Sequence, residues 1–188
     1  MKKKIAIATL AVVCMTVGVG VIFARKKEKK TVEERPAKER FTATLVPAPK
    51  YADPVATIVV MDYTTDEDMK EYSVAYLNGG DGALQQALHK GMGYFNMGGN
   101  LAFGFVLARS ITNGSSRTEF LIGIPPPSYL VNEWRLYIPI NMQLDGKGNG
   151  SGVFYEAVKL QFDAQGNLHV IPRQEFPHKL INIHPMKN

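Results

Sequence analysis

The chain has 188 residues, of which 45% are hydrophobic and 21% charged, enough for one globular domain with its own core. Its net charge of +5 is misleading, because residues 1–40 hold 11 of the 22 Lys and Arg but only 4 of the 17 acidic residues. Residues 41–188 therefore carry a net charge of −2, and we expect no nucleic acid as a partner, since nucleic-acid binders need clustered positive charge on their folded face.

The N-terminal segment predicts export across a bacterial membrane. Lysines at residues 2–4 precede 20 uncharged, mostly apolar residues, 5–24. Residues 1–24 are then either a signal peptide or an uncleaved anchor, since 20 helical residues at about 1.5 Å each span a hydrocarbon layer of about 30 Å. We expect an exported, extracytoplasmic protein, periplasmic, secreted, or held by one N-terminal transmembrane helix with the membrane as a partner. The sole cysteine, Cys14, lies here, which leaves the folded part without disulfides or a thiolate metal site.

Residues 25–40, RKKEKKTVEERPAKER, predict a charged, flexible linker, because they cannot bury enough apolar surface to fold. Residues 41–188 are expected to form a single domain. Its first two strands are predicted at 41–46 and 56–63, which are rich in β-branched and aromatic residues.

A helical hairpin is predicted next. Thr65 followed by Asp68 has the pattern of a capping box at the start of a helix. The dipeptide NG at 78–79 predicts the end of that helix, and Asp81 begins a second short helix that Gly91 ends.

Period-two alternation follows the helices and predicts a three-stranded meander over residues 92–124. The dipeptide NG at 113–114 is typical of a two-residue hairpin turn. That turn pairs Leu107 with Phe120, and it collects the large apolar side chains of both strands on one face.

Later strands are predicted by alternating apolar residues at 135–144, 151–162, 168–172 and 180–183. Strands before and after a helical pair in the sequence predict an α+β domain. We expect a mainly antiparallel curved sheet or small barrel-like sandwich with an inserted helical hairpin.

The glycine-rich segments predict turns. GGDGALQQ, at 79–86, lacks the third glycine of a dinucleotide-binding loop, and its letters are explained by a helix end and a helix start. DGKGNGSGVFYE, at 145–156, resembles a calcium loop but has Lys147 where a ligand oxygen is needed. No histidine pair has a zinc-enzyme spacing. We therefore expect no metal and no cofactor.

Two groups of residues are candidates for ligand binding. Arg117 and Glu119 fall on the non-core face of the predicted hairpin, with Arg109 at its end, and together they could line a cleft; solvated cross-strand charges are the default interpretation. Tyr129, Trp134 and Tyr137 surround the strand after the proline run and form either an aromatic binding patch or part of the core.

The order of segments resembles a group of uncharacterised exported bacterial proteins. The resemblance rests on TTDEDMKEYSVAYLNGGDGALQQALHK, then GY, LDGKGNGSG, VKLQFDAQGNLHV and LINI. It covers most of residues 56–183 and implies export and one domain, with no activity and no functional residues to carry over.

The function expected from the sequence is a non-enzymatic domain of the cell envelope that binds an apolar small molecule, a lipid or an envelope protein. One alternative is a structural or assembly partner without a ligand. Another is a hydrolase with dispersed residues such as His89, Glu119 and Arg109, whose groups would have to reach one substrate.

Overall fold

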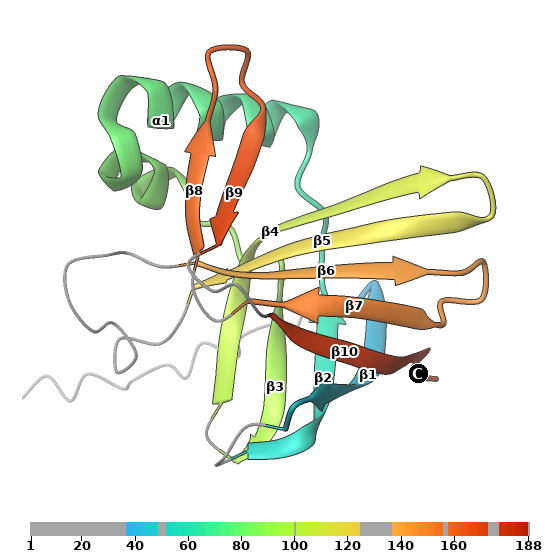
Figure 1. Cartoon of the computed structure of the whole chain (residues 1–188). Helices are drawn as coiled ribbons and strands as arrows, with labels where there is room; N and C mark the ends of the chain where they lie inside the picture. The colour runs from blue at the N-terminus through green and yellow to red at the C-terminus, as the bar shows by residue number, and fades with distance from the viewer. Residues whose placement is uncertain are drawn as a thin grey trace, which may run out of the picture. The chain divides into compact units, whose positions relative to one another are not determined.

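The computed structural model describes residues 37–48, 52–99, 101–124, 137–155, 158–172 and 177–187. The strands within them are listed in chain order: β1 (Glu39–Val46), β2 (Ala52–Val60), β3 (Gly93–Gly99), β4 (Leu101–Asn113), β5 (Ser116–Ile124), β6 (Ile138–Leu144), β7 (Gly150–Phe154), β8 (Val158–Phe162), β9 (Leu168–Pro172) and β10 (His178–Pro185). One helix, α1 (Asp66–Ala87), lies between β2 and β3 (Figure 1). The predicted leader at 1–24 lies outside the described residues, and the helix within them is not long and apolar enough to cross a bilayer.

Eight of the strands form a closed antiparallel barrel, in the order β1-β10-β7-β6-β5-β4-β3-β2. The last strand closes it, because β10 pairs with β1 on one side and with β7 on the other. The remaining two strands, β8 and β9, form a separate hairpin. The predicted α+β class with a mainly antiparallel, barrel-like sheet is therefore confirmed.

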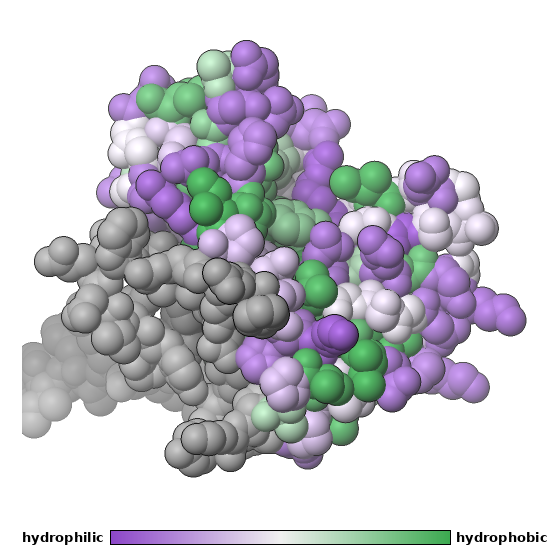
Figure 2. All heavy atoms as spheres, in the orientation of Figure 1, coloured by the Kyte–Doolittle hydropathy of each residue, from purple (hydrophilic) through white to green (hydrophobic). Residues whose placement is uncertain are grey.

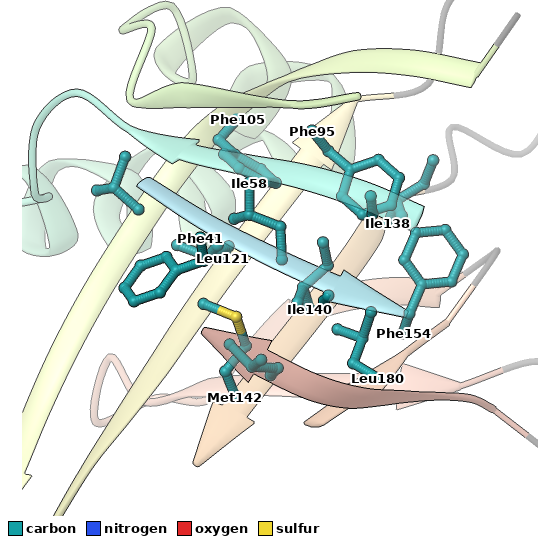
Figure 3. Close-up of a cluster of buried hydrophobic side chains, with 14 of the residues drawn as sticks. Phe41, Ile58, Phe95, Phe105, Leu121, Ile138, Ile140, Met142, Phe154 and Leu180 are labelled. Carbon is teal, nitrogen blue, oxygen red and sulfur yellow. The ribbon is translucent and has the colours of Figure 1, made fainter. Parts of the chain in front are cut away.

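The barrel interior is filled by side chains. Phe41, Ile58, Phe95 and Ile140 come from four different strands, and each is at most 1% exposed (Figure 3). Phe95 stacks on Phe103 with ring centroids 4.9 Å apart. An eight-stranded barrel is just wide enough for its side chains to fill the interior, and these buried side chains pack there as one cluster.

A second apolar cluster lies on the outside of the barrel, beneath α1 and the β8–β9 hairpin (Figure 1). Tyr72 and Leu84 of α1 meet Leu107 of β4, Ile122 of β5 and Leu160 of β8. Strands β4 and β5 are therefore covered on both faces, by the barrel core on one side and by the helix and hairpin on the other.

The predicted register of the β4–β5 hairpin is wrong by two residues. The turn lies at 114–115, and Leu107 pairs with Ile122 rather than with Phe120. A register shift between Phe105 and Leu107 then sends these two side chains to opposite faces. The single apolar face expected from the sequence does not form, because a bulge changes which side chains point inward.

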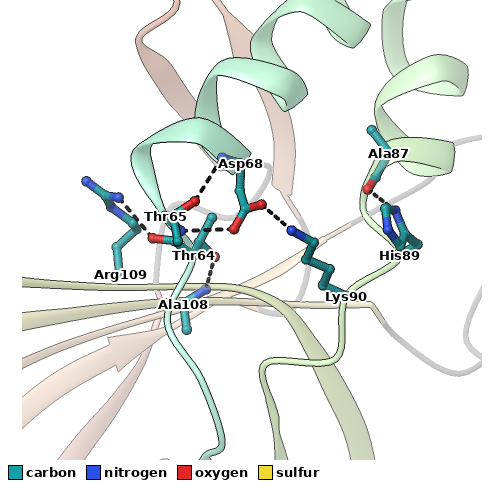
Figure 4. Close-up of polar contacts among 8 residues, drawn as sticks. All are labelled: Thr64, Thr65, Asp68, Ala87, His89, Lys90, Ala108 and Arg109. Carbon is teal, nitrogen blue, oxygen red and sulfur yellow. Dashed lines mark hydrogen bonds and ion pairs between the residues drawn. The ribbon is translucent and has the colours of Figure 1, made fainter.

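The start of α1 is fixed to β4 by hydrogen bonds (Figure 4). The predicted capping box is present: Asp68 N donates to Thr65 Oγ1 at 3.1 Å, and Thr65 N donates to Asp68 Oδ2 at 3.0 Å. Thr64 N donates to Ala108 O at 2.7 Å, and Ala108 N donates back to Thr64 Oγ1 at 3.0 Å. The helix therefore begins at a fixed point on the barrel wall.

The predicted break between two helical segments occurs at Gly80, with φ 63° and ψ −154°, one residue beyond the expected NG dipeptide. The second segment ends at Ala87, with Leu88 as its cap, earlier than the predicted stop at Gly91. A conformation with this φ and ψ is accessible essentially only to glycine.

We predict opposite outcomes for alanine at two neighbouring glycines of α1. Gly80→Ala should reduce the free energy of unfolding by about 1–3 kcal/mol, because the backbone at Gly80 is closed to a residue with a Cβ atom. Gly82→Ala is the control, since nothing lies within 4 Å of its added Cβ; it should be neutral or stabilise by up to about 1 kcal/mol. Urea unfolding measures both, and equal effects would contradict the assignment of the break to Gly80.

Candidate functional site

One end of the barrel, the barrel mouth, is polar. It is formed by the start of β1, the β4–β5 and β6–β7 turns, and the end of β10, which all lie on the same side in Figure 1. Figure 2 shows mostly hydrophilic residues over this side of the molecule.

An ion pair between β1 and β5 crosses this end of the barrel. Arg117 Nη1 donates to Glu39 Oε1 at 2.7 Å, and Nη2 donates to Glu39 Oε2. The guanidinium also lies over the ring of Phe41, 5.8 Å from its centroid, within the range of a cation–π interaction. The two hydrogen bonds to Glu39 hold the guanidinium in one orientation. They also raise the pKa of Arg117.

Glu119 lies behind this pair and is fully buried. Ser110 Oγ donates to Glu119 Oε1 at 2.6 Å, and Arg117 Nε lies 3.4 Å from the same oxygen. The expectation that Glu119 sits on a solvated face is wrong. The face of β5 that carries Arg117 and Glu119 points into the barrel, because β5 pairs with β6 as well as with β4 and the sheet closes around it.

Burial and neighbouring charges shift the acid–base properties of this group. Burial raises the pKa of Glu119 above its ordinary value, while the hydrogen bond from Ser110 and the charge of Arg117 oppose the rise. Burial and the charge of Glu119 likewise raise the pKa of Tyr63, so its hydroxyl stays protonated. Tyr63 Oη lies against the Glu119 carboxyl, but neither Tyr63 Oη nor Glu119 Oε2 completes a hydrogen bond of regular geometry.

An open pocket of about 460 Å³ lies at the barrel mouth. Its lining residues are Lys38, Glu39, Arg40, Phe41, Thr112, Gly114, Ser115, Ser116, Arg117, Asp145, Gly146, Lys147, Gly148, Pro185 and Met186. Four cations and two carboxylates are among them, which gives the lining a net charge of +2. Pockets of this volume are in the range that accommodates small molecules.

The β6–β7 turn at the rim of the pocket is organised by Asp145. Its Oδ1 accepts hydrogen bonds from Lys147 N and Asn149 N, each at 2.8 Å, and these bonds lower the pKa of Asp145. His184 Nδ1 and Asn149 Oδ1 lie 3.0 Å apart and connect the turn to β10. The turn is therefore a fixed part of the pocket wall.

The same turn occurs a second time, between β8 and β9. Asp163 Oδ1 accepts from Gln165 N and Asn167 N, each at 2.9 Å. Both turns read D-x-x-G-N, and their glycines, Gly148 and Gly166, have φ values of 81° and 82°. The predicted hairpin loop at 145–156 thus contains a short Asp-centred turn followed by β7.

The residues expected from the sequence do not all meet at this site. Arg117 and Glu119 do, but Arg109 lies on the outside of β4, where Nη1 donates to Thr64 O at 2.9 Å and Nη2 pairs with Asp66. Tyr137 is buried in the apolar cluster beneath α1. Tyr129 and Trp134 lie outside the described residues. The expected cleft of two arginines and one glutamate is therefore not formed.

Of the pocket lining, the sequence singled out only Arg117. Lys38, Glu39 and Arg40 were assigned to the end of the linker, and the lining residues of the β4–β5 and β6–β7 turns were expected only as turns. Glu39 belongs to β1 and shares its inward face with Phe41 and Leu45. The signal is present in ERFTATL, where Glu39 is in phase with the apolar residues of the strand.

Comparison with known proteins adds no relative: no protein-family model, curated protein or solved structure matches this chain. Within the described part of the chain, no three His, Cys, Asp or Glu side chains come together as a metal site.

We predict that Glu119 makes the stability of the protein depend on pH. Because its folded-state pKa is raised, ionisation is less favourable in the folded than in the unfolded state, and wild-type stability falls as pH rises from about 4.5 through the raised pKa. Glu119→Gln removes this loss, by about 1.4 kcal/mol for each unit of the shift. In urea unfolding at a series of pH values, the free energy of unfolding of Glu119→Gln should exceed that of the wild type by an amount that grows with pH.

The exposed Glu67→Gln serves as the matched control for this measurement. Its stability curve should run parallel to that of the wild type. A Glu119→Gln curve that is also parallel to the wild type would contradict the assignment.

Proposed function

We propose that this protein is an exported, non-enzymatic domain of the bacterial cell envelope that holds a small ligand at the barrel mouth. The observation that carries this proposal is the open pocket of about 460 Å³ above a fixed Arg117–Glu39 pair. The export leader and the resemblance to exported bacterial proteins support the location.

The packing of the barrel decides where a ligand can be held. The interior residues Phe41, Phe95, Phe105 and Ile140 are at most 1% exposed, and their side chains occupy the space in which a lipocalin-like barrel would take an apolar molecule. An apolar part of the ligand would have to lie outside the barrel, and the barrel mouth would bind the polar group of the ligand.

The three residues considered for a hydrolase do not form one site. Glu119 is inside the barrel, Arg109 is bound to the start of α1, and His89 Nδ1 lies 2.7 Å from Ala87 O at the other end of the helix. Figure 4 shows Arg109 and His89 on opposite sides of the capping cluster. General acid–base partners need to reach one substrate, so this arrangement favours binding over hydrolysis.

We predict that filling the pocket abolishes ligand binding. The mature protein, isolated from its host envelope and analysed by native mass spectrometry, should carry a small molecule, and Thr112→Trp should lose it because Thr112 lines the pocket. Ile111→Trp is the matched control: the residue is adjacent, 59% exposed and not part of the lining. It should retain the ligand.

Two results would count against the proposal. One is a wild-type protein that carries no ligand and is not stabilised by any compound of a metabolite and lipid library; with a stoichiometric envelope complex in crosslinking, that result would favour the assembly-partner alternative. The other is ligand retention by Thr112→Trp. Cell fractionation tests the location, and a cytoplasmic protein would contradict export.

A further inference from the structure

We infer that the ligand of the barrel mouth carries an anionic group of the size of a phosphate ester, recognised by Arg40, Lys147 and Arg117. This inference rests on the proposed function and adds the chemical class of the ligand. It follows from which charges of the pocket lining are already engaged.

The two carboxylates of the lining are engaged by the protein itself. Both oxygens of Glu39 accept hydrogen bonds from Arg117. Asp145 Oδ1 accepts from two backbone N–H groups of its own turn. A cationic ligand would therefore have to compete with these hydrogen bonds for its acceptors.

The cations of the lining are less engaged. Lys38 pairs with Asp62 at 2.5 Å, but no carboxylate of the described residues forms an ion pair with the side-chain nitrogens of Arg40 or Lys147. Both residues are exposed and line the pocket, Arg40 from β1 and Lys147 from the β6–β7 turn. An anion between them gains attraction from both at little desolvation cost.

Arg117 is a further cation of the lining, and its orientation is fixed. Its guanidinium is fixed by Glu39 and Phe41, so it presents its remaining surface to the pocket at no further entropic cost. Thr112 and Ser115 belong to the same lining, and hydroxyl groups of this kind can donate to the oxygens of a phosphate. Cations and neutral donors around one small pocket are the recognition chemistry of a phosphate ester.

Such a group can come from a soluble phosphate ester or from the headgroup of an anionic lipid. Lys38 lies in the lining of the pocket, and the exposed Met186 lies on the same rim. A basic rim with an exposed apolar residue fits a headgroup. The shared chemistry is the phosphate, and the experiment separates the two sources.

The first arm measures soluble anions. Isothermal titration calorimetry of the mature protein with inorganic phosphate and with sn-glycerol 3-phosphate should give binding that weakens as salt is added. The double variant Arg40→Gln, Lys147→Gln should bind about tenfold more weakly, the equivalent of one lost charge-assisted hydrogen bond. Lys179→Gln, an exposed lysine on β10 away from the lining, should bind as the wild type does.

The second arm measures lipid. The mature protein is combined with phosphatidylcholine nanodiscs, with and without phosphatidylglycerol, and hydrogen exchange is followed at the turns 114–116 and 146–148. A lipid source predicts protection of these turns only with phosphatidylglycerol, lost in the double variant and kept in Lys179→Gln. A soluble source predicts calorimetric binding without protection by the nanodiscs.

The outcomes distinguish the inference from the proposed function. The inference is overturned if neither arm responds, or if binding is indifferent to salt and to the double variant. If Thr112→Trp still displaces a co-purified ligand in that case, the proposed function stands and only the anionic class is wrong. If Thr112→Trp displaces nothing, both fail.

Discussion

The pairing of β10 with β1 is the constraint on which the rest of the structure depends. It joins the last strand of the chain to the first and turns an antiparallel sheet into a closed barrel. Closure removes the sheet edges and limits the interior to the volume that eight strands enclose. Aromatic and aliphatic side chains fill that volume, and the open pocket lies at an end of the barrel.

Strands β4 and β5 connect the two parts of the fold. A register shift between Phe105 and Leu107 turns one of these side chains into the barrel and the other toward α1. The paired hydrogen bonds between Thr64 and Ala108 fix the start of α1 on β4. The helix and the β8–β9 hairpin thus cover one wall of the barrel. The barrel mouth is formed by turns and by the ends of β1 and β10.

The polar end of the barrel encloses a buried acid, Glu119. An ionised carboxylate without partners would be strongly unfavourable at this depth, and Glu119 is accommodated by Ser110, by Arg117 and by a raised pKa. Arg117 in turn connects Glu119 to Glu39 of β1. The same arginine closes the polar interior and lines the pocket, so the ligand recognition that we propose would depend on the side chain that also pairs with both acids of the barrel end.

The sequence alone determined the class of the fold, since period-two alternation and the Thr65–Asp68 capping box depend on neighbours a few residues apart. It also placed Arg117 and Glu119 on one face of a strand, because side chains two apart share a face in any sheet. Only the tertiary structure decided that this face is inside: the bulge after Phe105 and the pairing of β5 with β6 are long-range events. The same is true of Glu39, whose partner Arg117 lies 78 residues away and meets it only because the sheet closes.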